Sequence, residues 1–101
     1  MMTCYVRYIL DPYQLDAFEQ YARFWIARVK QVGGTHHGYY LPSEGANNIA
    51  LTLFSFESFA AYEQYRQANA ADPACKAMLD HAKQGRYIIS FERSFMRPLF
   101  E

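Results

Sequence analysis

The chain has 101 residues, and ten Lys and Arg balance ten Asp and Glu, so its formal net charge is zero. This balance gives no electrostatic footprint for nucleic acid, whose phosphates require a basic face, and no block of like charges indicates a membrane surface or an acidic partner. Apolar residues make up 51% of the chain and aromatic residues 18%. A small monomer does not easily hide so much aromatic surface, so we expect part of it in a subunit interface or a pocket.

The two cysteines, Cys4 and Cys75, lie too far apart in the sequence to form a CxxC unit or a disulfide framework. We expect both to be small buried hydrophobic residues in a reducing cytoplasm. No apolar run approaches the roughly 18 residues of a transmembrane span, and MMTCYVRYIL lacks the features of a signal peptide. The chain therefore indicates one cytoplasmic domain over residues 1–101.

The first half of the chain predicts a strand, a helix and a second strand. Residues 3–10 are rich in β-forming residues and alternate in character. Asp11-Pro12 is typical of a helix start, with Asp as the cap, Pro at the first helical position and Gln14 completing a capping box. Gly33-Gly34 ends the helix, and a strand follows at about 35–41. The apolar stripe of the helix comprises Leu15, Phe18, Ala22, Trp25, Ile26 and Val29.

The second half predicts a strand, two helices and a last strand. The loop 42–47 leads into a strand at about 48–56, and Ser58 caps the next helix. Asp72-Pro73 repeats the opening of the first helix, and Gly85 sits where a C-terminal cap is expected. The last strand spans about 87–96 and stops before Pro98. The inner sides of the two helices are Phe59, Tyr62 and Tyr65, then Cys75, Met78, Leu79 and Ala82.

The order β-α-β-β-α-α-β is that of an α+β, ferredoxin-like fold whose second helix is broken in two. It predicts an antiparallel sheet of strand order 4-1-3-2 with the helices on one face. Both faces of most strands are substantially apolar, whereas a sheet open to water would alternate more cleanly. We therefore expect a second copy of the sheet to cover the other face, making a homodimer.

His36 and His37 are adjacent, so in a regular strand they point to opposite faces. Thr35, His37, Tyr39 and Leu41 would share one face, and His36, Gly38 and Tyr40 the other. The pair therefore does not predict a metal site, although the nearby glycines would permit a bulge that changes this. No phosphate-binding loop, GxSxG motif or carboxylate cluster occurs. We expect no metal and no cofactor.

Several segments together resemble the NIPSNAP family, within the dimeric α+β barrel proteins. They are the strand around Tyr5 and Tyr8, the helix with Phe24-Trp25, the turn Gly33-Gly34, NNIALTLFSFESFAAYEQYR (47–66), ADPACKAML (71–79) and RSFMRPL (93–99). Ala74-Cys75 departs from the aromatic residue that family members often carry after Asp-Pro. The resemblance implies a homodimer whose two sheets enclose a cavity. Similar barrels include cofactor-free monooxygenases, haem-degrading enzymes, dehalogenases and isomerases, so the resemblance does not fix the chemistry.

The candidate site follows from the face that would line this barrel. His37, Tyr39 and Arg7 are the expected catalytic residues, because imidazole moves protons near neutral pH, Tyr can hold an enolate or phenolate oxygen, and Arg binds carboxylates. Arg7 and Glu92 could instead form an ion pair across adjacent strands. The expected substrate-binding residues are Tyr5, Thr52, Glu92 and His36.

Two readings stay open. The first is an enzyme of monooxygenase-like or isomerase-like activity that acts on a small aromatic or carbonyl-bearing molecule without a cofactor. The second is a non-catalytic module that binds a ligand or a protein. A polar, roomy cavity would favour the enzyme, and an interior filled by Phe and Tyr would favour the module.

Overall fold

The computed structural model describes residues 1–100. Its elements follow the predicted order: β1 (Met2–Leu10), α1 (Leu15–Gln31), β2 (Thr35–Tyr40), β3 (Ile49–Phe56), α2 (Phe59–Ala71), α3 (Pro73–Gly85) and β4 (Ile88–Met96). The strands form one antiparallel sheet of order β2-β3-β1-β4, which is the predicted order read from the other edge. The α+β, ferredoxin-like fold is thereby confirmed.

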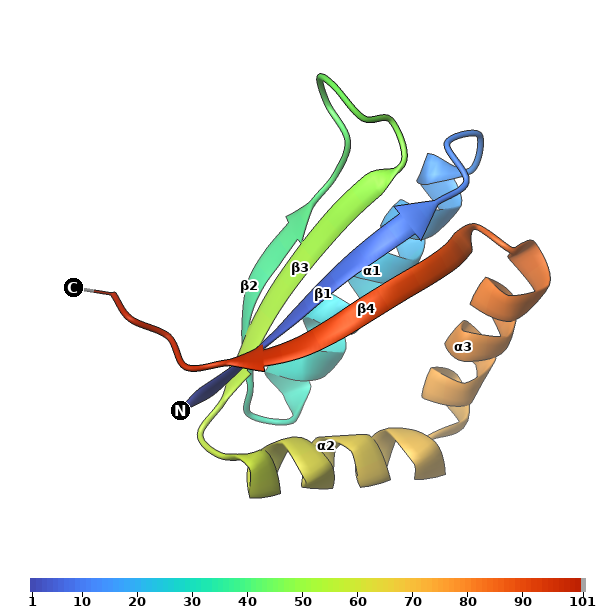
Figure 1. The fold of residues 1–101 in the computed structure, drawn as a ribbon. Helices are drawn as coiled ribbons and strands as arrows, with labels where there is room; N and C mark the ends of the chain where they lie inside the picture. Colours follow the sequence, from blue (N-terminus) through green and yellow to red (C-terminus); the bar gives the residue numbers. More distant parts are fainter. Residues whose placement is uncertain (101) are drawn as a thin grey trace.

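The three helices lie on one side of the sheet (Figure 1). The ribbon of α1 runs behind the strands, whereas α2 and α3 form a bent arm that continues past the edge strand β4. The C-terminal segment after β4 leads away from the helices. Within residues 1–100 no helix is both long and apolar enough to cross a membrane.

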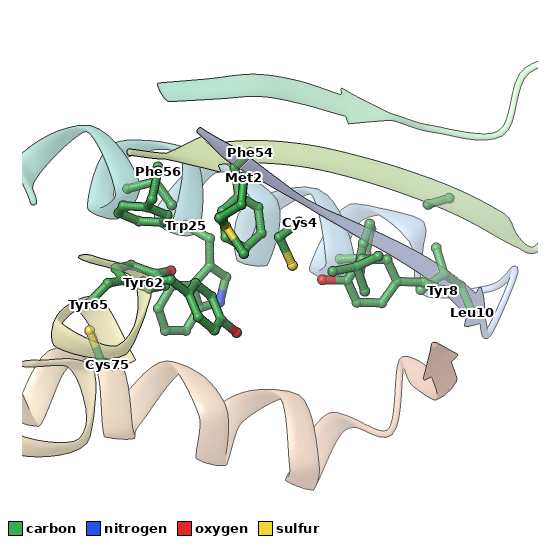
Figure 2. Packing of buried hydrophobic residues seen from close by; sticks show 14 of the residues in the cluster. Met2, Cys4, Tyr8, Leu10, Trp25, Phe54, Phe56, Tyr62, Tyr65 and Cys75 are labelled. Atoms are coloured by element: carbon green, nitrogen blue, oxygen red, sulfur yellow. The ribbon is translucent and has the colours of Figure 1, made fainter. Parts of the chain in front are cut away.

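The core lies between the sheet and these helices, as Figure 2 shows for the side chains that β1 and β3 direct toward α2 and α3. Cys4, Val6 and Leu10 of β1 are buried against the predicted stripe of α1, of which Phe18 and Val29 are almost fully covered. Each such apolar side chain contributes about 1.5–3 kcal/mol when it leaves water. The stripe is therefore confirmed as the face by which α1 packs on the sheet for Phe18, Ala22, Trp25 and Val29, whereas Ile26 lies outside the core cluster.

One predicted helix start is wrong, and two are confirmed. Helix α1 begins only at Leu15, because the Asp11 carboxylate accepts hydrogen bonds from the Tyr13 backbone (2.9 Å) and the Gln14 side chain (2.8 Å), which fixes a turn. Ser58 does cap α2, because its hydroxyl accepts a hydrogen bond from the Ala61 backbone N–H. Asp72 caps α3 in the same way, by accepting from the Ala74 N–H.

The end of α3 also differs from the prediction. Gly85 is the last helical residue, and the left-handed position falls on Arg86, whose φ is 54°. Glycine is required at position 85 for another reason: a Cβ there would lie 2.9 Å from the Tyr87 ring. Two residues of the predicted inner faces are exposed as well, Phe59 on α2 and Leu79 on α3.

Candidate functional site

A β-bulge in β2 decides which side chains face the helices. The β2–β3 register pairs His36 with Phe54 and then Tyr39 with Thr52, so it shifts between His36 and Tyr39. Gly38 adopts φ +100° within this shift, a conformation that glycine adopts without steric penalty. The rings of His36 and Tyr39 consequently stack on the same side, with centroids 5.2 Å apart. The prediction that His37 and Tyr39 share a face is therefore wrong.

His36 is held as a neutral hydrogen-bond donor. Its Nδ1 accepts the Gly38 backbone N–H at 2.9 Å, so the ring proton of the neutral form lies on Nε2. Burial, with smaller electrostatic contributions from His37 and Lys30, lowers the pKa of His36 to about 4. Nε2 lies 3.4 Å from the Thr52 hydroxyl, which itself donates to the Gly38 carbonyl at 3.1 Å. With Nδ1 occupied, His36 is poorly suited to accept a proton.

A cavity of about 450 Å³ lies between this face of the sheet and the three helices. His36 and Tyr39 line it from β2, and side chains from every other element complete the wall. The stack of His36 on Tyr39 continues to Phe54, whose ring centroid is 5.8 Å from that of His36. The aromatic lining residues besides these three are Tyr8, Tyr21, Trp25, Tyr62 and Tyr65. The volume is within the range of small-molecule sites.

The tyrosine hydroxyls of this wall remain protonated at neutral pH. Burial raises the pKa of Tyr8 and Tyr39 well above the usual value, and the nearby hydroxyl of Tyr21 raises both further. Burial likewise raises the pKa of Tyr65 to about 12. The tyrosines can therefore donate hydrogen bonds to an oxygen atom in the cavity but cannot serve as bases there.

Trp25 presents an unpartnered polar group. The side chain is only 8% exposed, and its indole Nε1–H has no hydrogen-bond acceptor among the described residues. Tyr21 packs edge to face on the indole, with centroids 6.0 Å apart. The Trp25 N–H lies close enough to the Tyr21 hydroxyl to oppose the rise of the Tyr21 pKa, but the two groups do not reach the geometry of a hydrogen bond. Trp25 lines the cavity, and Figure 2 shows it between the strands and α3. A buried donor without a partner is unfavourable, so an acceptor atom placed in the cavity would stabilise it.

Three cations surround the cavity: Arg66 on α2, Lys76 on α3 and Arg93 on β4. No Asp or Glu occurs among the described residues that line it. The ion pairs found within residues 1–100 are Arg23–Glu19 and Arg28–Asp72, so none of the three has a carboxylate within 4.0 Å there. The local excess of positive charge contrasts with the zero net charge of the whole chain.

The opposite face of the sheet, here called the open face, carries the other half of the predicted site. His37 Nε2 lies 2.8 Å from the Ser55 hydroxyl, which lies 2.7 Å from that of Thr3. Within residues 1–100 no carboxylate forms an ion pair with His37, so this pair lacks the third group of a catalytic triad. Arg7 lies opposite Glu92 in the β1–β4 register, as expected, but in the described chain the two form no ion pair.

The predicted site residues are thus divided between two faces. The helix face and its cavity bring together His36 and Tyr39, with Thr52 fully buried beside them. The open face holds His37, Arg7, Tyr5 and Glu92. Residues 1–100 contain no group of three or more His, Cys, Asp or Glu that could hold a metal ion.

The sequence reasoning missed several residues of the cavity. Trp25 was expected only on the apolar stripe of its helix, and Arg66 and Lys76 were not among the predicted site residues. Arg66 follows the inward-facing Tyr62 by one helical turn, which is the one signal in the sequence that could have placed it near the core.

Comparisons with known proteins agree with this fold. The NIPSNAP family model matches residues 5–100. A NIPSNAP family protein of unknown function from Agrobacterium tumefaciens has a TM-score of 0.79 at 20% identity, covering 97% of this chain and 87% of that one. An uncharacterised NIPSNAP domain protein from Burkholderia xenovorans has a TM-score of 0.79 at 17% identity, covering 98% of this chain and 95% of that one.

A more distant similarity extends beyond these proteins. A proposed antibiotic biosynthesis monooxygenase from Nitrosomonas europaea has a TM-score of 0.75 at 9% identity, with 99% of this chain and 100% of that one covered. At such identities the solved structures show the fold alone. No curated protein matches the chain.

Proposed function

The chain belongs to the NIPSNAP family, and we propose that it binds a small molecule in the cavity between its sheet and its helices. The observation that carries this proposal is the buried, unpartnered Trp25 N–H in a cavity of about 450 Å³ walled by aromatic rings. Well-packed interiors leave few buried donors without an acceptor, so this N–H is the feature that sets the cavity apart.

The chemistry of the lining favours stabilisation of negative charge over proton abstraction. The tyrosine hydroxyls, the His36 Nε2–H and the Trp25 N–H are donors, whereas His36 is already neutral with its acceptor nitrogen occupied. Such an environment stabilises an enolate or a phenolate, the ionised form that reacts in cofactor-free oxygenation or isomerisation. The monooxygenase-like fold of the Nitrosomonas europaea protein supports this reading. Binding without turnover is the alternative.

The single tryptophan makes binding directly observable, because Trp25 gives one indole N–H signal in a ¹H–¹⁵N NMR spectrum. We expect 1-naphthol and 2-naphthaldehyde to shift this signal. Ala70→Phe should narrow the cavity that Ala70 lines and weaken the effect, whereas Ala68→Phe, on the same helix but not lining the cavity, should leave it unchanged. An indole signal that no small aromatic compound moves would contradict the proposal. Oxygen uptake in the presence of a compound that binds would show turnover, and would therefore distinguish the enzyme from the binding module.

We also propose that two copies associate through their open faces. Tyr5, Leu51 and Leu53 lie there half-exposed, outside the core that the helices cover. Burial of such an apolar face against a second copy would be strongly favourable. Because Cys4 and Cys75 are both free and buried, we place the dimer in the reducing cytoplasm.

A further inference from the structure

We infer that the ligand of this cavity is a planar aromatic carboxylate, whose ring lies along the Tyr39–His36–Phe54 stack and whose anionic oxygens lie among Trp25, Arg66 and Arg93. The inference rests on the proposed function and goes beyond it, because it names the ligand class. Three independent features of the cavity lead to it.

The first feature is the shape and character of the wall. The His36 ring is nearly parallel to that of Tyr39, at 15°, and to that of Phe54, at 18°, with centroids 5.2 and 5.8 Å apart, so three rings from β2 and β3 form a row of offset, near-parallel rings. Tyr8 extends the row from β1, with its ring 6.2 Å from that of Tyr39. A flat aromatic ligand can contact such a row over its whole face, whereas a flexible chain would lose rotational freedom without comparable contact.

The second feature is the need for an acceptor. The Trp25 N–H is a donor only, and it is buried without a partner within residues 1–100. The His36 Nε2–H makes only a long contact of 3.4 Å with the Thr52 hydroxyl. An oxygen atom of a ligand would give the Trp25 N–H an acceptor and the His36 Nε2–H a closer acceptor than Thr52. A carboxylate offers about four acceptor positions against two for a neutral carbonyl.

The third feature is the charge. Arg66, Lys76 and Arg93 border the cavity, and no acidic side chain of the described lining offsets them. The charge of Arg93 acts within the cavity: burial raises the pKa of Tyr21 and of Tyr62, and Arg93 opposes the rise in both. Arginine binds carboxylates through two parallel hydrogen bonds, so the arginines favour this acidic group over a neutral one.

The experiment compares three probes of similar size: 2-naphthoate, its neutral amide 2-naphthamide, and the aliphatic anion decanoate. Binding is followed at the Trp25 indole signal and by calorimetry. We expect 2-naphthoate to bind at least about tenfold more tightly than either of the others, a ratio that one charge-assisted hydrogen bond can supply. A hydrogen bond to the carboxylate should also move the indole proton downfield.

Single substitutions separate the contributions. Arg93→Gln and Arg66→Gln should each weaken 2-naphthoate binding and leave 2-naphthamide binding unchanged. The matched control Arg23→Gln, which removes a cation engaged with Glu19 on the surface of α1, should change neither. Trp25→Phe keeps an aromatic ring and removes the donor, so calorimetry should show weaker binding of 2-naphthoate to this variant.

The outcomes distinguish this inference from the proposed function. Equal binding of 2-naphthoate and 2-naphthamide, or tighter binding of decanoate, would overturn the ligand class and leave a cavity that binds small molecules. Loss of 2-naphthoate binding in Arg23→Gln to the same extent as in Arg93→Gln would overturn the assigned position of the carboxylate. If none of the probes binds, and the naphthol and naphthaldehyde do not bind either, the proposed function fails as well.

Discussion

His36 shows how one residue acquires a role opposite to the one its type suggests. Histidine is usually the side chain that changes charge near neutral pH. Here burial between two aromatic rings lowers the pKa to about 4, and the bond from the Gly38 N–H fixes the position of the ring proton. The residue therefore stabilises the bulge and donates a hydrogen bond toward the cavity, and it remains neutral throughout the physiological range.

This arrangement predicts a pH dependence of the free energy of unfolding. The pKa of His36 is lower in the folded protein than in the unfolded chain, where it lies near 6.5, so the unfolded state takes up a proton first as the pH falls. As the pH falls from about 6.5 to about 4, the free energy of unfolding should therefore decrease by on the order of 2 kcal/mol. Above this window His36 should cause no further change of stability with pH.

Denaturant titrations at pH 7.5 and 4.5 measure the effect. His36→Asn retains an acceptor for the Gly38 N–H but does not titrate, so this variant should lose that part of the pH dependence. His37→Asn, outside the aromatic stack, should keep most of it, because burial is the main cause of the lowered pKa and His37 contributes less. The same pH dependence in wild type and His36→Asn would mean that His36 is not neutral in the fold.

At the scale of the elements, the bulge in β2 is the feature on which the cavity depends. Gly38 at φ +100° turns Tyr39 to the side of His36, and nothing lies within 4 Å of the position that a Cβ would occupy there. Gly45, in the β2–β3 loop, has a similar φ of +94° and an equally open surrounding. An alanine substitution at each of the two glycines therefore separates the cost of backbone strain, which both share, from the effect on the site, which only Gly38 should have.

We expect Gly38→Ala and Gly45→Ala each to lower stability by roughly 1–2 kcal/mol, because an L-residue at positive φ is strained. Only Gly38→Ala should also weaken the binding of 2-naphthoate, because only this substitution disturbs the His36–Tyr39 stack. Thermal unfolding and calorimetric titration measure the two effects. Comparable loss of binding in both variants would contradict the importance of the bulge.

Much of this element level could be predicted from the sequence. Alternation in strands, the 3.6-residue periodicity around Trp25 and the caps at Ser58 and Asp72 are local signals, and they gave the correct element order and sheet order. The start of α1 was wrong because Asp11 uses its carboxylate in a turn, for which the same residues are equally suited.

The candidate site was far less predictable. Glycine permits a bulge but does not require one, and a shift of a single residue exchanges the faces of all side chains that follow. The expected group of His37, Tyr39 and Arg7 was consequently divided between two faces. The missing partner of the Trp25 N–H depends on the packing of several elements at once, and no local pattern in the sequence encodes it.

At the scale of the whole molecule, the open face determines the assembly. A dimer should have about twice the mass of the 11.8 kDa chain in light scattering at micromolar concentration. Leu53→Glu places a charge at the centre of the face and should yield a monomer, because burial of an unpaired carboxylate is strongly unfavourable. Tyr13→Glu, at a position 94% exposed outside the face, should remain a dimer.

Circular dichroism of the Leu53→Glu variant checks that the fold survives, since Leu53 lies outside the core that the helices cover. A wild-type protein that is monomeric under these conditions would exclude the proposed dimer. It would leave the cavity proposal intact, because the described cavity is formed within one chain.

The most direct measurement is a crystal structure of the wild-type protein grown with 2-naphthoate. We predict density for the ligand between the sheet and the helices, with its ring along Tyr39 and a carboxylate oxygen within hydrogen-bonding distance of Trp25 Nε1. Ligand density between two open faces, beside His37 and Arg7, would contradict this location and return the site to the interior of a barrel. A helix-side cavity that is closed by its own side chains in the crystal would contradict the account altogether.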